Sequence, residues 1–281
     1  MMKICIVGAG TMGAGIAQVM ATGENDVVLC DIQKAAVRRG KEMIEKTLNK
    51  LVSKGRMPQE EADAALSRIR TCVGLSMAAD CDLVLEAALE KMEVKIDIFQ
   101  HLDEICSDNT IYVTNTSSLS ITEIATATKR PERFAGMHFF NPAYVMKLVE
   151  IVRGSETSDA TIEFIRNLAI SIGKEPVEVS EAPGFVVNRI LVPMINEAIF
   201  ILEEGLASPE DIDKAAVLGA NHPMGPLAVS DLVGNDVILA IMETLLRETG
   251  DSKYRPAPLL RKMVRARKLG KKTGEGFYKY N

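Results

Sequence analysis

The sequence predicts an α/β fold in which a doubly wound, mainly parallel sheet is followed by an all-helical domain. Three observations support this prediction. Short β-rich runs alternate with longer helical patterns up to about residue 180, and such alternation is typical of parallel sheets. These runs are continuously apolar, as expected of strands buried on both faces. Beyond residue 184 the strand signal almost disappears.

The candidate strands are eight short apolar runs. They are Lys3–Val7, Val27–Asp31, Thr71–Val73, Leu83–Leu85, Ile111–Thr114, Ala135–His138, Lys147–Val152 and Pro176–Val179. The last two can extend the sheet in mixed orientation, and their order along its edge cannot be deduced. Helical stretches separate the runs, and they include Ala35–Val52, Val94–Cys106 and Ala160–Ile172.

The second half is predicted to contain helices only. Phe185–Glu204 repeats its apolar residues at helical spacing. Ser208 has the pattern of an N-cap, and Pro209 follows it at the first position of the expected helix. Pro223–Arg247 and Pro256–Lys268 are expected to be two further helices.

We therefore place a domain boundary near Glu181–Pro183. This gives a Rossmann-type sheet domain over residues 1–182 and an all-helical substrate and dimerisation domain over residues 183–281. The helical half has more apolar surface than a small bundle needs, which predicts a homodimer through this domain.

The composition is that of an ordinary globular protein. Of 281 residues, 47% are apolar and 25% charged, and the net charge of −5 comes without a strongly basic domain, so nucleic-acid binding is not expected. No run reaches about eighteen apolar residues, and no signal peptide is recognisable, so no membrane association is expected. The five cysteines form no CxxC pair, which favours a reduced, cytoplasmic setting. No metal site is predicted.

The first βαβ unit has the pattern of a dinucleotide-binding site. Gly8 permits a tight turn, Gly10 lets the backbone approach a pyrophosphate, and Gly13 lets the helix pack close to the sheet. The N-terminus of that helix favours phosphate binding. The expected cofactor-binding residues of this unit are Gly8, Gly10, Thr11, Met12, Gly13 and Asp31.

Asp31 determines the expected cofactor. It lies eighteen residues after Gly13, where a carboxylate can accept hydrogen bonds from the ribose hydroxyls of NAD and would repel the 2′-phosphate of NADP. Arg38 and Arg39 are close by and keep NADP as an alternative.

His138 is the candidate catalytic residue among three histidines. It ends a β-like run, and ligands of open α/β sheets bind beyond the carboxyl ends of strands. A histidine there can exchange a proton with a substrate near neutral pH, or it can simply satisfy loop carbonyls. Glu150, inside a later apolar strand, is costly to bury unpaired and can orient this imidazole. The alternative for Glu150 is an edge-strand position facing water.

Two further segments can touch a ligand. Asn115–Ser118 follows a strand and carries an amide and small hydroxyls, although it can equally be the N-cap of the helix expected near Ile121. Asn188 would sit one turn inside the first helix of the second domain, where asparagine is not a favoured helix former.

The chain resembles the short-chain 3-hydroxyacyl-CoA dehydrogenase family, and most closely its bacterial 3-hydroxybutyryl-CoA dehydrogenases. The motifs that carry the resemblance are Gly8–Gly13, Asn115–Leu119, His138–Pro142, Lys147–Glu150, Ala182–Arg189, Asn221–Pro226 and Leu269–Tyr278. They occur in the family's order over nearly the whole chain. The resemblance implies NAD-dependent interconversion of an (S)-3-hydroxyacyl-CoA and its 3-oxoacyl-CoA.

The resemblance also implies roles for individual residues. His138 matches the catalytic base and Glu150 its orienting partner, while Ser117 and Asn188 match residues that bind the reacting oxygen and position the thioester. The family's further cofactor-lining positions correspond to Glu90, Lys95, Asn115, Asn141 and Lys272.

Coenzyme A would meet Thr47 and Lys54, although lysines at this helix end can simply be solvated. Tyr144 departs from the family, where proline is common, and could alter the loop beside the acyl pocket. Two other readings remain open: a β-hydroxyacid dehydrogenase acting on free acids, and a non-catalytic structural member of the family.

Overall fold

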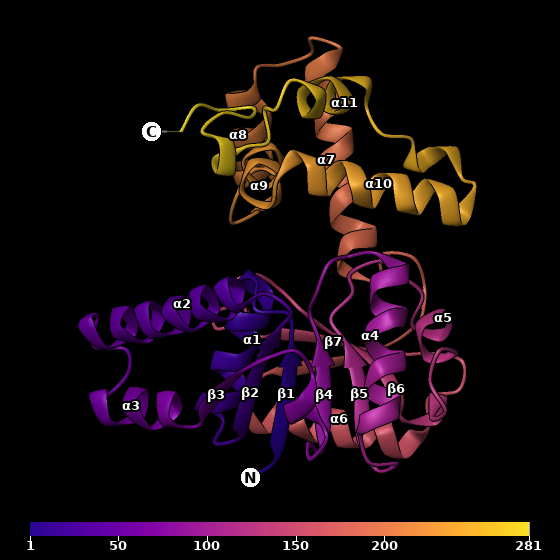
Figure 1. The fold of residues 1–281 in the computed structure, drawn as a ribbon. Coiled ribbons are helices and arrows are strands. Elements are labelled where there is room, and N and C mark those ends of the chain that lie inside the picture. Colours follow the sequence, from indigo (N-terminus) through magenta and orange to yellow (C-terminus); the bar gives the residue numbers. More distant parts are fainter. Residues whose placement is uncertain (281) are drawn as a thin grey trace. The chain divides into compact units, whose positions relative to one another are not determined.

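The computed structural model describes residues 1–280, and the chain divides into two compact units. The first comprises Met1–Ala182 and the second begins at Pro183. The sheet lies in the first unit, whereas the regular elements of the second unit are helices together with isolated β-bridges in its C-terminal segment (Figure 1). This architecture confirms the predicted fold class.

The first unit is built on one eight-stranded sheet with the order β3-β2-β1-β4-β5-β6-β7-β8. Its strands are β1 (Lys3–Val7), β2 (Asp26–Asp31), β3 (Ile69–Val73), β4 (Leu83–Glu86), β5 (Ile111–Thr114), β6 (Phe134–Phe139), β7 (Leu148–Arg153) and β8 (Glu175–Ser180). All neighbours are parallel except β6 and β7, which are antiparallel. The carboxyl ends of β1, β2, β4, β5 and β6 therefore share one edge, at the top of the sheet in Figure 1.

The eight predicted strands are all present, and β7 and β8 join the sheet in mixed orientation. The expectation that every strand is buried on both faces is wrong for β3 and β8, in which most residues are exposed or half-buried. Both are edge strands, so helices cover them less completely than the central strands.

Helices cover both faces of this sheet (Figure 1). They are α1 (Thr11–Thr22), α2 (Lys34–Ser53), α3 (Gln59–Ser67), α4 (Met92–Ile105), α5 (Ile121–Ala125) and α6 (Asp159–Ser171). One core cluster joins residues of α1, α2, α3 and α6 to the strands. Against the other face, Phe99 of α4 packs on Tyr112 and Phe134, with ring centroids 5.5 and 4.6 Å away.

Over residues 183–280, the part of the second unit that the structure describes, five α-helices surround an apolar core of their own. They are α7 (Val187–Glu203), α8 (Pro209–Ala220), α9 (Pro226–Val233), α10 (Asn235–Thr249) and α11 (Pro258–Arg265). The predicted single helix Pro223–Arg247 is wrong, because the chain breaks at Gly234 with φ +113°. A Cβ at Gly234 would also lie 2.8 Å from Nζ of Lys272.

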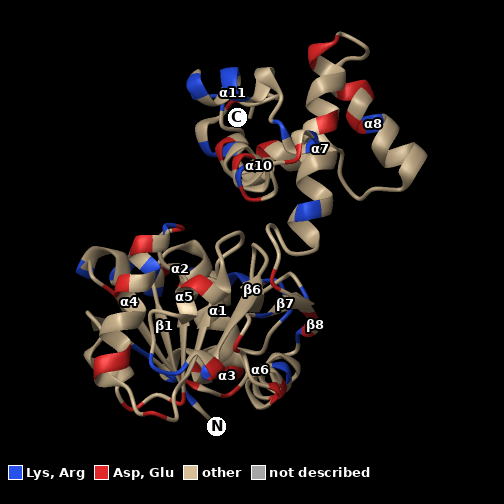
Figure 2. Cartoon of the chain, turned by 90° about the vertical axis from the view of Figure 1, so that its right-hand side faces the viewer, with Lys and Arg blue, Asp and Glu red and all other residues tan. Residues whose placement is uncertain are grey.

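Buried carboxylates tie the helices of the second unit together. Asp213 accepts the backbone N–H groups of Leu227 and Ala228 at the start of α9, at 2.8 and 2.9 Å. Asp231 accepts N–H groups of Phe277 and Tyr278 at 3.0 and 2.9 Å, and this holds the C-terminal segment against α9. Lysine, arginine and acidic residues are interspersed over both units (Figure 2). Within residues 1–280, no helix is long and apolar enough to cross a membrane.

Candidate active site

The glycine turn after β1 has the geometry that its sequence pattern implies. Gly8 has φ +103°, and a Cβ there would lie 2.6 Å from the carbonyl oxygen of Ala87. A Cβ on Gly13 would lie 1.7 Å from the carbonyl oxygen of Gly8, so only glycine allows α1 to start this close to the turn. At Gly10 nothing lies within 4 Å of the Cβ position, and no side chain caps α1. The helix start is therefore open to a phosphate group.

Asp31 is tied to the same turn. Its carboxylate accepts the N–H of Ala9 at 2.9 Å and the N–H of Gln33 at 2.9 Å. Each carboxylate oxygen can accept more than one hydrogen bond, so Asp31 can still receive ribose hydroxyls. The β2 end and the glycine turn thus form one preorganised edge.

His138 and Glu150 form a buried pair. They lie directly opposite each other in the antiparallel register of β6 and β7. The Nδ1 atom of His138 is 2.8 Å from Oε2 of Glu150, and the two side chains are 7% and 1% exposed. Because an ionised carboxylate only accepts hydrogen bonds, the contact with Glu150 is made by an Nδ1–H of His138. Phe140 packs on the imidazole, with ring centroids 4.5 Å apart.

Asn115 links the ends of β5 and β6. Its side-chain oxygen accepts the N–H of Phe139 at 2.8 Å, immediately after His138. The Asn115–Ser118 segment is not the N-cap of α5, because Ser120 caps that helix. Asn115 therefore helps hold the strand end that carries the histidine.

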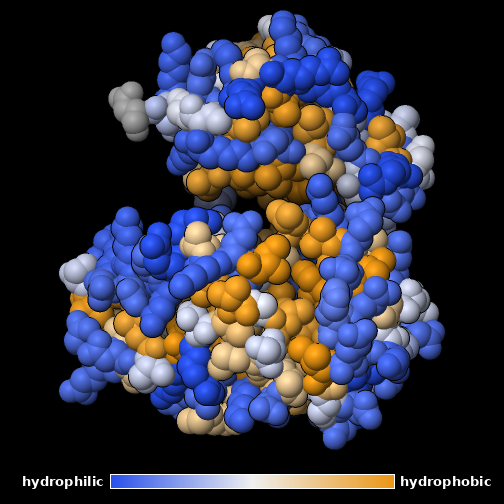
Figure 3. Space-filling view, in the orientation of Figure 1, coloured by the Kyte–Doolittle hydropathy of each residue, from blue (hydrophilic) through white to orange (hydrophobic). Residues whose placement is uncertain are grey.

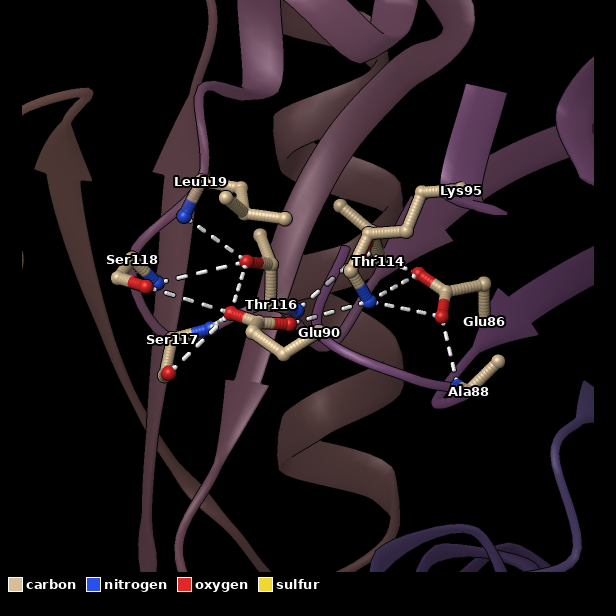
Figure 4. Close-up of polar contacts among 9 residues, drawn as sticks. All are labelled: Glu86, Ala88, Glu90, Lys95, Thr114, Thr116, Ser117, Ser118 and Leu119. Atoms are coloured by element: carbon tan, nitrogen blue, oxygen red, sulfur yellow. Dashed lines mark hydrogen bonds and ion pairs between the residues drawn. The ribbon is translucent and has the colours of Figure 1, made fainter. Parts of the chain in front are cut away.

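Glu90 accepts hydrogen bonds from the hydroxyl-rich turn after β5 (Figure 4). Its Oε1 atom accepts the hydroxyl of Thr116 at 2.5 Å and both the N–H and hydroxyl of Ser117, at 2.8 and 3.2 Å. Burial raises the pKa of Glu90, but Lys95, the Thr116 hydroxyl and the Ser117 amide together lower it below its usual range. The ionised carboxylate is an acceptor only, so the Ser117 hydroxyl donates its proton to Glu90.

A buried ion pair lies next to Glu90. Lys95 is 1% exposed, and its Nζ lies 2.8 Å from both carboxylate oxygens of Glu86 and 3.2 Å from Oε2 of Glu90 (Figure 4). Glu86 is fully buried at the end of β4 and also accepts the Thr114 hydroxyl at 2.6 Å. The three charged groups join β4, β5 and α4 at the edge where the candidate site lies.

A cavity of about 250 Å³ lies beside α1 and α2. Three of the predicted ligand residues, Thr11, Thr47 and Asn141, line it together with Tyr144. The Thr47 hydroxyl donates to the carbonyl oxygen of Met43 within α2. Lys54 is not part of this lining; it follows α2 seven residues later, about 10 Å further along the helix axis.

Two predicted site residues belong to the second unit. Asn188 is the second residue of α7, so it lies in the first turn and not one turn inside the helix. Lys272 in the C-terminal segment pairs with Asp236 at 2.5 Å.

The sequence reasoning missed Glu86, and it named Thr116 only as part of the Asn115–Ser118 segment, without a role of its own. A signal for Glu86 was present, because it is an acidic residue at the carboxyl end of an apolar strand, the same position that singled out His138. No local sequence pattern predicts the contacts of the Thr116 hydroxyl, which accepts the N–H of Leu119 at 3.0 Å and donates to Glu90.

Comparisons with known proteins identify the family. Residues 3–182 match the model "3-hydroxyacyl-CoA dehydrogenase, NAD binding domain", and residues 184–280 match the C-terminal domain of the same family.

Individual relatives cover the chain at full length. The chain is 52% identical to a 3-hydroxybutyryl-CoA dehydrogenase of Clostridioides difficile over 100% of both chains. It is 44% identical to the human mitochondrial hydroxyacyl-coenzyme A dehydrogenase over 99% of this chain and 90% of that protein. The crystal structure of (S)-3-hydroxybutyryl-CoA dehydrogenase from Ralstonia eutropha superposes with a TM-score of 0.95, at 49% identity and 99% coverage of each chain. The chain belongs to the 3-hydroxyacyl-CoA dehydrogenase family.

Proposed function

We propose that this protein is an NAD-dependent dehydrogenase that interconverts (S)-3-hydroxybutyryl-CoA and acetoacetyl-CoA. The relatives named for this activity are similar over the full length, and the first unit matches the NAD-binding domain of the family. The observation that carries the proposal is the buried His138–Glu150 pair, because 3-hydroxyl oxidation needs a general base with a defined tautomer.

The groups at the edge of the first unit suit NAD. The Cβ position of Gly10 is open, the start of α1 has no side-chain cap, and Asp31 offers a carboxylate to ribose hydroxyls. When bound, NAD supplies the acceptor for the hydride that leaves C3 of the substrate.

His138 moves the proton. In the oxidation direction Nε2 takes the proton of the 3-hydroxyl as hydride leaves C3, and Glu150 stabilises the imidazolium that forms. In the reduction direction the protonated ring returns that proton to the oxygen. A general base in this position contributes about 10²–10⁴ in rate.

Ser117 and Asn188 are proposed to bind the reacting oxygen and position the thioester. The contact between Ser117 and Glu90 adds a condition, because its hydroxyl donates to that carboxylate at 3.2 Å. To donate to a developing alkoxide, the Ser117 hydroxyl must rotate away from Glu90. While this hydroxyl donates its hydrogen bond to Glu90, its oxygen can only accept a hydrogen bond from a ligand. The other proposed ligand contacts are those of Glu90, Lys95, Asn115, Asn141 and Lys272 with the cofactor, and of Thr47 and Lys54 with coenzyme A.

The proposal is tested by initial rates with acetoacetyl-CoA, longer 3-oxoacyl-CoAs and free 3-oxo acids, each with NADH and NADPH. We expect turnover of acetoacetyl-CoA with NADH. His138→Ala should still bind NADH, as followed by its fluorescence, and lose about 10²–10⁴ in turnover. Reduction of free acids alone would instead support a β-hydroxyacid dehydrogenase, and no NADH oxidation with any substrate would support a structural role.

We further propose that the second unit forms a homodimer. Large apolar side chains remain exposed on it, including Ile190, Leu206, Leu218 and Leu232 at 68, 74, 74 and 53%, and apolar side chains are visible at the surface of this unit in Figure 3. Contiguous exposed apolar surface typically marks an interface. Light scattering at micromolar concentration should give twice the chain mass, and a monomer would refute this part. The cytoplasmic location stays a prediction.

A further inference from the structure

One buried lysine of the first unit has no part in the site described so far. Lys174 is 8% exposed and lies in the turn between α6 and β8. Gly173, with φ +73°, ends α6; its N–H bonds the carbonyl of Ile170 at 3.0 Å, and the N–H of Lys174 bonds the carbonyl of Ala169 at 2.9 Å. This pair of bonds is a Schellman motif, so the helix end fixes the backbone from which the Lys174 side chain extends.

The side chain of Lys174 reaches a distant loop. Its Nζ donates to the carbonyl oxygens of Ala143 and Met146, at 2.5 and 2.8 Å. Both carbonyls belong to residues 140–147, the segment that connects β6 to β7 and follows His138. The ammonium group of Lys174 therefore donates hydrogen bonds to two carbonyl oxygens of this connection.

Burying the ammonium group of Lys174 costs free energy, and the two hydrogen bonds that it makes there fix the position of the loop. Burial lowers the pKa of Lys174, which means that the surroundings disfavour the cation. Its acceptors are carbonyls and not a carboxylate, so no opposite charge repays the desolvation. Two N–H donors remain even on the neutral amine, so the tie holds in either protonation state.

The segment held by Lys174 forms one wall of the cavity beside α1 and α2. Asn141, Ala143 and Tyr144 line this cavity together with Thr47. Ala143 is 2% exposed, and a Cβ on Gly15 of α1 would lie 3.3 Å from its Cβ. Ala143 is thus held between α1 at its side chain and Lys174 at its carbonyl.

We propose that Lys174 is a positioning residue that fixes residues 140–147 as the acyl-CoA-facing wall of this cavity. The inference rests on the proposed function, because it assigns the cavity to the acyl-CoA. Lys174 bonds this segment through the carbonyls of Ala143 and Met146, away from Asn141, the one residue of the segment that is proposed to contact the cofactor. Its loss should therefore weaken acyl-CoA binding more than NADH binding and leave hydride transfer nearly unchanged.

The test compares Lys174→Met, which keeps an apolar stem but removes the donors, with Lys174→Arg, which keeps donors. Lys129→Met removes an exposed lysine of the same unit and serves as the control. We expect KM for acetoacetyl-CoA to rise about tenfold in Lys174→Met, about the free energy of one charge-assisted hydrogen bond, while kcat stays within about twofold and the Kd for NADH rises by less than this KM. Lys174→Arg should restore most of the KM.

Hydrogen exchange measures the positioning directly. Amides of residues 140–147 should exchange faster in Lys174→Met, with the other amides of the sheet unit unchanged. An unchanged KM together with unchanged exchange in this segment overturns the inference. So does a parallel loss of kcat, NADH binding and thermal stability, because that pattern indicates general structural damage. Should Lys174→Met fail to fold, Lys174→Gln with its shorter donor takes its place beside Lys174→Arg.

The two proposals fail in different ways. If the wild-type protein neither turns over nor binds acetoacetyl-CoA by calorimetry, the proposed function is wrong and the assignment of the cavity falls with it. If wild type and Lys174→Met bind and reduce acetoacetyl-CoA equally, only the role of Lys174 is refuted.

Discussion

The sharpest prediction concerns Glu150→Gln, which removes one charge from a buried pair and changes the shape of the side chain little. In the oxidation direction a positive charge develops on His138, 2.8 Å from Oε2 of Glu150. Both side chains are almost completely buried, so water screens their interaction weakly. A hydrogen bond between charged groups contributes about 1.5–3 kcal/mol, and the attraction of two charges about 4 Å apart near a protein surface is about 4 kcal/mol.

A loss of about 2–4 kcal/mol of transition-state stabilisation corresponds to a fall of roughly 30- to 1,000-fold in kcat. The fall becomes larger if the new amide donates to Nδ1, since this would leave Nε2 protonated and unable to act as the base. The assay is NADH formation from 3-hydroxybutyryl-CoA at saturating substrate, with NADH affinity measured separately. Glu175→Gln is the matched control, because Glu175 is exposed on the neighbouring strand β8.

The reasoning would be refuted by near-normal turnover of Glu150→Gln between about pH 6 and pH 8, the range in which histidine is active as a base. An equal loss in Glu175→Gln would refute it as well, because the effect would then not belong to the buried pair.

Three further predictions follow from other parts of the sheet unit. Gly13→Ala should lose NADH binding and destabilise the fold by about 1–3 kcal/mol or more through overpacking against Gly8, whereas Gly10→Ala should fold normally in urea titrations and lose only NADH affinity; equal stability of the two variants would contradict this. Phe99→Ala should cost about 3–5 kcal/mol in urea denaturation, since the ring is fully buried, and a loss below about 1 kcal/mol would show that the cluster collapses around the gap. The pKa of Glu90 is lowered in the fold, so its contribution to stability is present above roughly pH 4 and disappears as the pH falls further; the stability difference between wild type and Glu90→Gln should shrink in acid, and a constant difference would contradict the assignment.

Much of the fold was predictable because its signals are local. Continuous apolar runs identified the eight strands, and each was found within two residues of its expected ends. One helix prediction failed where a local pattern was interrupted by a single backbone conformation. Gly234 splits the expected helix after Pro223 into α9 and α10, since glycine in an apolar helical pattern does not by itself reveal a positive φ.

The candidate site depended on contacts between segments far apart in the sequence. His138, Glu90 and Ser117 each lie at a strand end or turn that the sequence could locate, but no periodicity relates Glu90 to a turn 27 residues later. Lys174 gave no signal at all, because a lysine after a helix-ending glycine is usually solvated.

The sequence alone shows a glycine turn between a strand and a helix, followed by Asp31. These features determine a dinucleotide-binding edge, because each of them acts through its own backbone conformation or charge. Only the tertiary structure decided that β6 and β7 pair antiparallel, with His138 opposite Glu150. Strand register depends on how whole faces pack across the sheet, and shifting it by one residue would turn Glu150 to the other face. The residues of the proposed catalytic pair could thus be named from the sequence, whereas their contact depends on the fold of the complete sheet.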